Sequence, residues 1–219
     1  FAFLSAKAQI TDSTIVEPPS FKESSLKQFV LPTALIGTGL LTIGDRPYFS
    51  SQDTYNYLQK RWPNAHTRAD DITFIVPVVT VYGLNALGIK GKHGFLERTL
   101  LFALSATLAN SISLSLKHNV NYLRPDGSEF NSFPSGHTTN AFVASEFMHQ
   151  EYKSLCPWYS VYAYSFSIAT GSMRLVNNRH WMSDVLVGAG LGMISTKAVY
   201  LAYPSVKRGI KKRVLRREL

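Results

Sequence analysis

Six apolar stretches of helical length run along the chain, and no stretch of comparable strength alternates apolar and polar residues. Long apolar runs predict buried or membrane helices, whereas half-buried strands would show a period of two. The predicted helices cover residues 29–44, 72–89, 99–116, 138–149, 157–173 and 185–203. The pattern therefore predicts an all-α protein, a compact bundle of about six helices.

The polar segments divide the chain around this bundle. Residues 45–71 are polar with scattered aromatic residues, a composition compatible with a short amphipathic helix. We assign residues 1–8 as the remnant of a signal peptide, because an apolar run ends in the small-x-small sequence Ala6-Lys7-Ala8. An ordinary buried start is the alternative. Residues 9–28 form a polar N-terminal segment, 29–206 a single helical domain and 207–219 a basic tail.

Composition leaves two structural interpretations open. Charged residues make up 17% of the chain, which is few for a soluble domain, yet the mean hydropathy of -0.02 is low for a chain that crosses a bilayer repeatedly. A membrane span needs about 20 mostly apolar residues, and the predicted helices fall at or just below that length. An integral membrane bundle and a soluble periplasmic bundle both fit.

The formal charge of +9 is concentrated at the C-terminus, where residues 207–219 hold seven basic side chains against one glutamate, a net charge of +6. A short basic tail after an apolar segment indicates a cytoplasmic flank or contact with anionic lipid rather than a nucleic-acid module. The basic loop at 90–93 would share its side, which puts the loops after 116 and around 174 on the exported side. Five spans follow if the first helix does not cross, and six if it does.

Two polar motifs flank the predicted helices near the middle of the chain. Six residues separate Lys117 from Arg124, and Pro125 helps to end the helix there. The motif Pro134-Ser135-Gly136-His137 reads as a turn that feeds a helix, and free N–H groups at a helix start can hold an anion. The two motifs predict an anion site.

A third motif lies before the last predicted helix. Arg174 is followed by His180 after five intervening residues and by Asp184 after three more. Positions four apart stack on one helix face, so the Asp184 carboxylate can accept from one imidazole nitrogen. Because Cys156 is the only cysteine, an internal disulfide and a thiolate metal cluster are both excluded.

Together, the three motifs resemble the signature of the type 2 phosphatidic acid phosphatase (PAP2) and vanadium haloperoxidase superfamily: Lys-x6-Arg-Pro, Pro-Ser-Gly-His and Ser-Arg-x5-His-x3-Asp. They occupy residues 117–125, 134–137 and 173–184, and the chain is most similar in kind to the bacterial lipid phosphatases of that superfamily. Met173 stands where the signature has serine, a change that could remove one donor to phosphate.

The resemblance implies a phosphatase mechanism without a metal or another cofactor. His180 would attack phosphorus and form a phosphohistidine, with Asp184 orienting its ring. His137 would protonate the leaving alcohol and then activate water. The residues expected to bind phosphate are Lys117, Arg124, Ser135, Gly136 and Arg174. Residues 29–206 would then be the PAP2 phosphatase domain.

The expected substrate is a phosphate monoester or diphosphate of a lipid, such as phosphatidate, phosphatidylglycerophosphate, undecaprenyl diphosphate or lipid A. The resemblance implies an enzyme of the bacterial cell envelope whose site faces the periplasm, associated with the membrane and with no nucleic-acid partner. A soluble periplasmic acid phosphatase is the nearest alternative. A vanadium-dependent haloperoxidase and a non-catalytic anion or lipid binder are two further ones.

Overall fold

The computed structural model describes residues 26–44, 50–63 and 65–215. These residues form eight helices and no strand, which confirms the all-α prediction. The helices are α2 (Val30–Leu41), α3 (Ser51–Arg61), α4 (Asp70–Thr73), α5 (Val76–Ala86), α6 (Phe95–Val120), α7 (Gly136–Tyr152), α8 (Trp158–Val176) and α9 (Met182–Leu215). The assigned signal-peptide remnant and most of the segment 9–28 lie outside the described residues.

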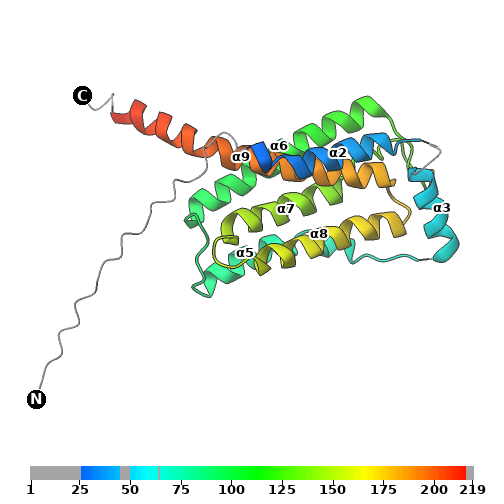
Figure 1. Cartoon of the computed structure of the whole chain (residues 1–219), viewed down its shortest axis with the longest axis horizontal. Coiled ribbons are helices and arrows are strands. Elements are labelled where there is room, and N and C mark those ends of the chain that lie inside the picture. The colour runs from blue at the N-terminus through cyan, green and yellow to red at the C-terminus, as the bar shows by residue number, and fades with distance from the viewer. Residues whose placement is uncertain (1–25, 45–49, 64, 216–219) are drawn as a thin grey trace, which may run out of the picture.

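Helices α2, α5, α6, α7, α8 and α9 run along the bundle, and α3 lies across one end (Figure 1). Helix α7 is central, because it packs against α5, α6, α8 and α9, while α2 packs along α9. Of the seventeen residues of α7, thirteen are buried. Helix α2 runs toward the α3 end, and α9 runs away from it and extends beyond the bundle (Figure 1).

The predicted count of about six helices was too low because two short helices lie before the second long one. Ser50 and Asp53 form a capping box that starts α3 within the polar segment. The predicted helix 72–89 is divided into α4 and α5, and Pro77 lies in the first turn of α5, where its missing N–H costs little. The last helix also continues through Pro204 to residue 215, into the predicted basic tail.

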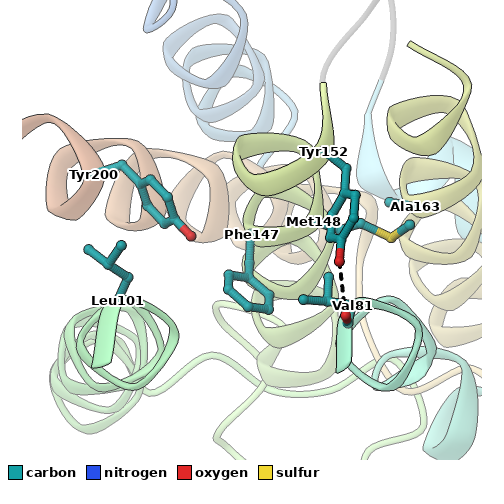
Figure 2. Packing of buried hydrophobic residues seen from close by; sticks show 7 residues of the cluster. All are labelled: Val81, Leu101, Phe147, Met148, Tyr152, Ala163 and Tyr200. Atoms are coloured by element: carbon teal, nitrogen blue, oxygen red, sulfur yellow. Dashed lines mark hydrogen bonds between the residues drawn. The ribbon is translucent and has the colours of Figure 1, made fainter. Parts of the chain in front are cut away.

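The larger of the two apolar clusters among the described residues packs the second half of α7 against its neighbours, as Figure 2 shows. Its buried residues are Val81, Leu101, Phe147, Met148, Tyr152, Ala163 and Tyr200. The Tyr152 hydroxyl donates to the Val81 carbonyl at 3.2 Å, which satisfies a polar group inside this core. The core joins α5, α6, α7, α8 and α9 and so fixes how these helices lie against one another.

Two buried carboxylates of α7 are neutralised by cations from neighbouring helices. The Glu146 carboxylate lies 2.8 Å from the Lys197 ammonium of α9. The Glu151 carboxylate accepts from the Arg98 guanidinium of α6 at 3.3 Å and from the Tyr200 hydroxyl at 2.8 Å. Both carboxylates are fully buried, and a buried carboxylate destabilises the fold unless it is paired and hydrogen-bonded.

Glycines let α9 approach α7 closely. A Cβ atom on Gly192 would lie 2.4 Å from the Thr139 carbonyl oxygen, and one on Gly188 would lie 2.8 Å from that of Ser135. Real side chains do not make such contacts, so only glycine permits this spacing. The close approach brings the start of α7 beside the start of α9.

Among the described residues, two helical segments, Phe95–Val120 and Met182–Ile210, are long and apolar enough to cross a bilayer by length and composition. Helix α6 also exposes a stripe of large apolar side chains at four-residue spacing: Leu96, Leu100, Leu104, Leu108 and Ile112. A continuous exposed apolar face of this kind needs a nonpolar surrounding.

Candidate active site

A cavity of about 470 Å³ opens at the α3 end of the bundle, where α6 and α8 end and α7 and α9 begin. Six of the eight predicted site residues line it: Lys117, Arg124, Gly136, His137, Arg174 and His180. The other two, Ser135 and Asp184, are fully buried in the turns that start α7 and α9. Predicted site residues up to 63 positions apart along the chain, from Lys117 to His180, therefore line one cavity.

His180 precedes α9 and is held by its carboxylate neighbour. Its Nδ1 atom lies 3.3 Å from the Oδ2 atom of Asp184. The same oxygen accepts from the Ser132 hydroxyl at 2.5 Å and from the Trp181 backbone N–H at 2.9 Å. Asp184 is thus fixed, and the Nδ1 contact leaves Nε2 of His180 as the ring nitrogen that can act as a nucleophile.

Burial lowers the pKa of His180 to about 4, although the hydrogen bond and the charge of Asp184 oppose this shift. The nearby Arg174 and Lys117 charges lower it further. The imidazole is therefore neutral near neutral pH. Only the neutral ring has a free lone pair with which to attack phosphorus.

Lys117 and Arg124 are positioned by the segment that connects α6 to α7. The Lys117 ammonium donates to the Asn131 carbonyl at 2.5 Å. The Arg124 Nε atom donates to the Asn131 side-chain oxygen at 2.9 Å, and its guanidinium lies 3.5 Å from Glu129. Asn131 therefore holds both cations at the wall of the cavity.

Arg174 lies in the last turn of α8 and is 8% exposed. One guanidinium nitrogen donates to Asp70 at 2.5 Å. Its Nε atom is buried without a hydrogen-bond partner among the described residues. A buried N–H group without an acceptor destabilises the protein unless an anion or water accepts its hydrogen bond, so this arrangement of Arg174 favours binding of an anionic ligand.

The start of α7 lines the cavity through Gly136 and His137. The Ser135 hydroxyl is the N-cap of α7, accepting from the Thr138 backbone N–H at 3.4 Å. It does not line the cavity, so its predicted contact with phosphate stays a prediction. Gly136 and His137 occupy the first turn, where N–H groups have no partner within the helix and can bind an anion.

His137 has a carboxylate partner that the sequence did not reveal. Its Nε2 atom lies 3.0 Å from the Oδ1 atom of Asp71, and its ring meets Phe74 edge-on with centroids 5.5 Å apart. Burial and the Arg174 charge lower the pKa of His137, while the Asp71 hydrogen bond opposes them. Asp71 thus favours the protonated ring.

Residues of the segment before α4 and of the first turn of α4 complete the cavity wall, and none of them was predicted as a site residue. They are His66, Thr67, Arg68, Asp70 and Asp71. The adjacent carboxylates at 70 and 71, just before an apolar segment, were the one signal available. Arg179 and Asn177 also line the cavity, whereas Met173, at the position of the signature serine, does not.

Comparison with known proteins identifies the family. A family model described as the PAP2 superfamily matches residues 98–208, just over half of the chain. The chain belongs to the PAP2 superfamily. All three of its signature motifs lie within the matched residues. Among the described residues, no three His, Cys, Asp or Glu side chains are grouped so that they could hold a metal ion.

One curated relative of this PAP2 chain is the lipid A 1-phosphatase of Porphyromonas gingivalis, 36% identical over 195 residues. The alignment covers 84% of this chain but 42% of the relative, so the chain spans less than half of that protein's length.

Two solved structures share the fold. One is LpxE of Aquifex aeolicus, with 21% identity and a TM-score of 0.50 over 66% of this chain and 93% of the other. The other is a transmembrane PAP2 type phosphatidylglycerolphosphate phosphatase of Bacillus subtilis, with 18% identity and a TM-score of 0.55 over 87% and 96%.

Proposed function

We propose that this PAP2 chain carries the catalytic site of a lipid phosphate phosphatase that works through a phosphohistidine on His180. One observation carries the proposal: a neutral histidine held by a carboxylate lines the same cavity as three cations, a helix start and a second histidine. Acid–base and anion-binding groups of this kind are what phosphoryl transfer requires.

The chemistry follows from the two histidines and the cations. The Nε2 atom of His180 attacks phosphorus, and His137 gives a proton to the departing oxygen. Lys117, Arg124 and Arg174 stabilise the charge on the equatorial oxygens, and the guanidinium groups can each bind two of them. Water then attacks phosphorus with His137 as base, which releases inorganic phosphate and restores His180.

A lipid substrate is supported by the apolar exterior and by the relatives. The stripe on α6 would lie in the acyl region of a bilayer, with the cavity beyond one end of that helix. The relative from P. gingivalis is named for lipid A. We infer that the substrate presents its phosphate at the membrane surface while its acyl chains stay in the bilayer.

The distribution of charge supports a site that faces the periplasm. The loop 90–93 and the basic segment of α9 lie at the end of the bundle opposite the cavity, and short cytoplasmic segments favour Lys and Arg (Figure 1). Helix α2, with 12 residues, is shorter than a full span, but it packs along α9 and runs from that basic end toward α3 (Figure 1). This favours the six-span arrangement over the five-span one.

The test is phosphate release from purified protein in detergent with a chelator present. We expect phosphatidate, a phosphatidylglycerophosphate or a phosphorylated lipid A to be hydrolysed, and His180→Ala to lose at least about 10⁴-fold in kcat. His118→Ala is the matched control, since that histidine lies outside the cavity. Hydrolysis that survives His180→Ala, or that needs an added divalent metal, would exclude the proposal.

A further inference from the structure

Helix α4 begins with two adjacent carboxylates that serve different groups in the cavity. Asp70 is 1% exposed and accepts from Arg174. Asp71 is hydrogen-bonded to His137. One residue pair thus contacts both a phosphate-binding cation and the proposed acid.

The position of α4 is fixed by contacts with α8. The Asn177 side chain accepts from the Thr67 backbone N–H at 2.8 Å and donates to the Thr67 carbonyl at 2.8 Å and to Asp70 at 3.2 Å. After α4 begins, Thr73 and Thr170 share a hydrogen bond of 2.8 Å. Because hydrogen bonds to α8 and its C-cap hold both the segment before α4 and the end of α4, Asp71 lies on a fixed helical turn rather than on a free loop.

The two histidines of the cavity use opposite ring nitrogens to bind their carboxylates. His180 contacts Asp184 through Nδ1, whereas His137 contacts Asp71 through Nε2. The carboxylate contact sets which nitrogen carries the hydrogen and which faces the reaction. For His137, the other nitrogen, Nδ1, has no hydrogen-bond partner among the described residues, and it is the one available to substrate.

We propose that Asp71 is a positioning residue for His137: it fixes the ring and stabilises the imidazolium that protonates the leaving oxygen. This inference rests on the proposed phosphatase function. Asp71 touches neither phosphorus nor the leaving group and acts only through His137.

The proton balance of the reaction gives Asp71 its role. As the bond from His180 to phosphorus forms and the ester bond breaks, the leaving oxygen takes the proton from His137, which becomes neutral. A water molecule then gives a proton to His137 while the water oxygen bonds to phosphorus and the bond between phosphorus and His180 breaks. Asp71 stabilises the charged form of His137 before the first step and after the second.

A purely structural role for Asp71 would be weak. Its side chain is 58% exposed and that of His137 is 35% exposed, and ion pairs this accessible contribute little to folding. Asp71→Asn is therefore expected to fold normally and to change catalysis selectively.

The experiment compares two substrates of one enzyme, an alkyl phosphate and a nitrophenyl phosphate. The alkoxide needs a proton to leave, whereas nitrophenolate does not. We expect Asp71→Asn to lower the rate of the first step, measured as release of the alcohol or phenol in the first turnover, by about tenfold for the alkyl phosphate and by less than about twofold for the nitrophenyl phosphate. His137→Ala should show the same selectivity, Asp71→Asn should add nothing to it, and Asp71→Glu should recover part of the rate.

Asp70→Asn is the matched control, because its carboxylate orients Arg174, which binds the phosphate common to both substrates. It should slow both reactions by the same factor. An equal loss for both substrates in Asp71→Asn, or an additive loss with His137→Ala, would overturn the inference. If the unmodified protein releases no phosphate from either substrate, it is the proposed function that fails.

Discussion

The substitution Gly188→Ala tests whether the spacing of α7 and α9 sets the catalytic geometry. Gly188 lies one turn after Asp184 on α9, and its added Cβ would meet the Ser135 carbonyl oxygen at 2.8 Å and the Thr139 hydroxyl at 3.1 Å. That carbonyl cannot simply turn away, because it accepts from the Thr139 N–H at 2.9 Å and from its hydroxyl at 2.9 Å. The start of α7 must move instead.

The size of the movement follows from the contact distance. Ordinary contacts begin at 3.4 Å, so α7 and α9 must separate by about 0.6 Å at this point. His137 follows Ser135 by two residues and moves with it relative to His180. Because a misplacement of about 1 Å can cost about 100-fold in rate, we expect kcat to fall by about tenfold or more. Overpacking should also lower the free energy of unfolding by about 1–3 kcal/mol.

The assay combines initial rates of phosphate release with thermal unfolding in detergent. The control is Gly83→Ala on α5, where an added Cβ meets nothing within 4 Å. That variant should keep its rate within about twofold and gain up to about 1 kcal/mol from helix propensity. A Gly188→Ala protein with unchanged kcat would refute the link between this spacing and the alignment of the two histidines.

Three further predictions concern titration, charge burial and the membrane. With a pKa of about 4 in the folded state against 6.5 ordinarily, His180 is protonated first in the unfolded chain as the pH falls. The free energy of unfolding should therefore drop by up to about 3 kcal/mol from about pH 6.5 to about pH 4. Thermal unfolding over the same pH range should show that the His180→Asn protein lacks this pH-dependent loss. Lys197→Met removes the cation beside the buried Glu146 carboxylate and should cost about 3–5 kcal/mol, most of which Glu146→Gln should restore in the double variant; equal melting of single and double variants would contradict this. The protein should leave membranes with detergent but not with high salt, and release by salt alone would favour the soluble bundle.

The long helices could be predicted because their apolar residues form uninterrupted stretches. The division at residues 74–75 could not be placed from the apolar pattern, because 72–89 is mostly apolar; Pro77 in the first turn of α5 and the packing of α4 against α8 accompany the break. The polar segment before it gave no clear helix period, and α3 depends on the local capping box of Ser50 and Asp53. Fold class was thus accessible from the apolar pattern, whereas the short helices depend on local capping and on tertiary contacts that this pattern does not show.

The site could be predicted as far as the three motifs reach. His180 and Asp184 are four residues apart, so helical geometry alone relates them. Asp71 and His137 are 66 residues apart, and Asp70 and Arg174 are 104 apart, so nothing local indicates either contact. Adjacent carboxylates also occur on many solvated surfaces, and only the folded chain distinguishes these two.

The central claim is tested most directly by trapping the enzyme during turnover with a radiolabelled lipid phosphate and mapping the labelled residue by mass spectrometry. The account predicts a phosphohistidine at His180 that is labile to acid and stable to base. The phosphohistidine should be absent in the His180→Ala protein. It should accumulate in the His137→Ala protein when the substrate has a good leaving group, because its formation then stays fast while its hydrolysis is slow. Label on a serine or carboxylate, or turnover of substrate by the His180→Ala protein, would contradict the account.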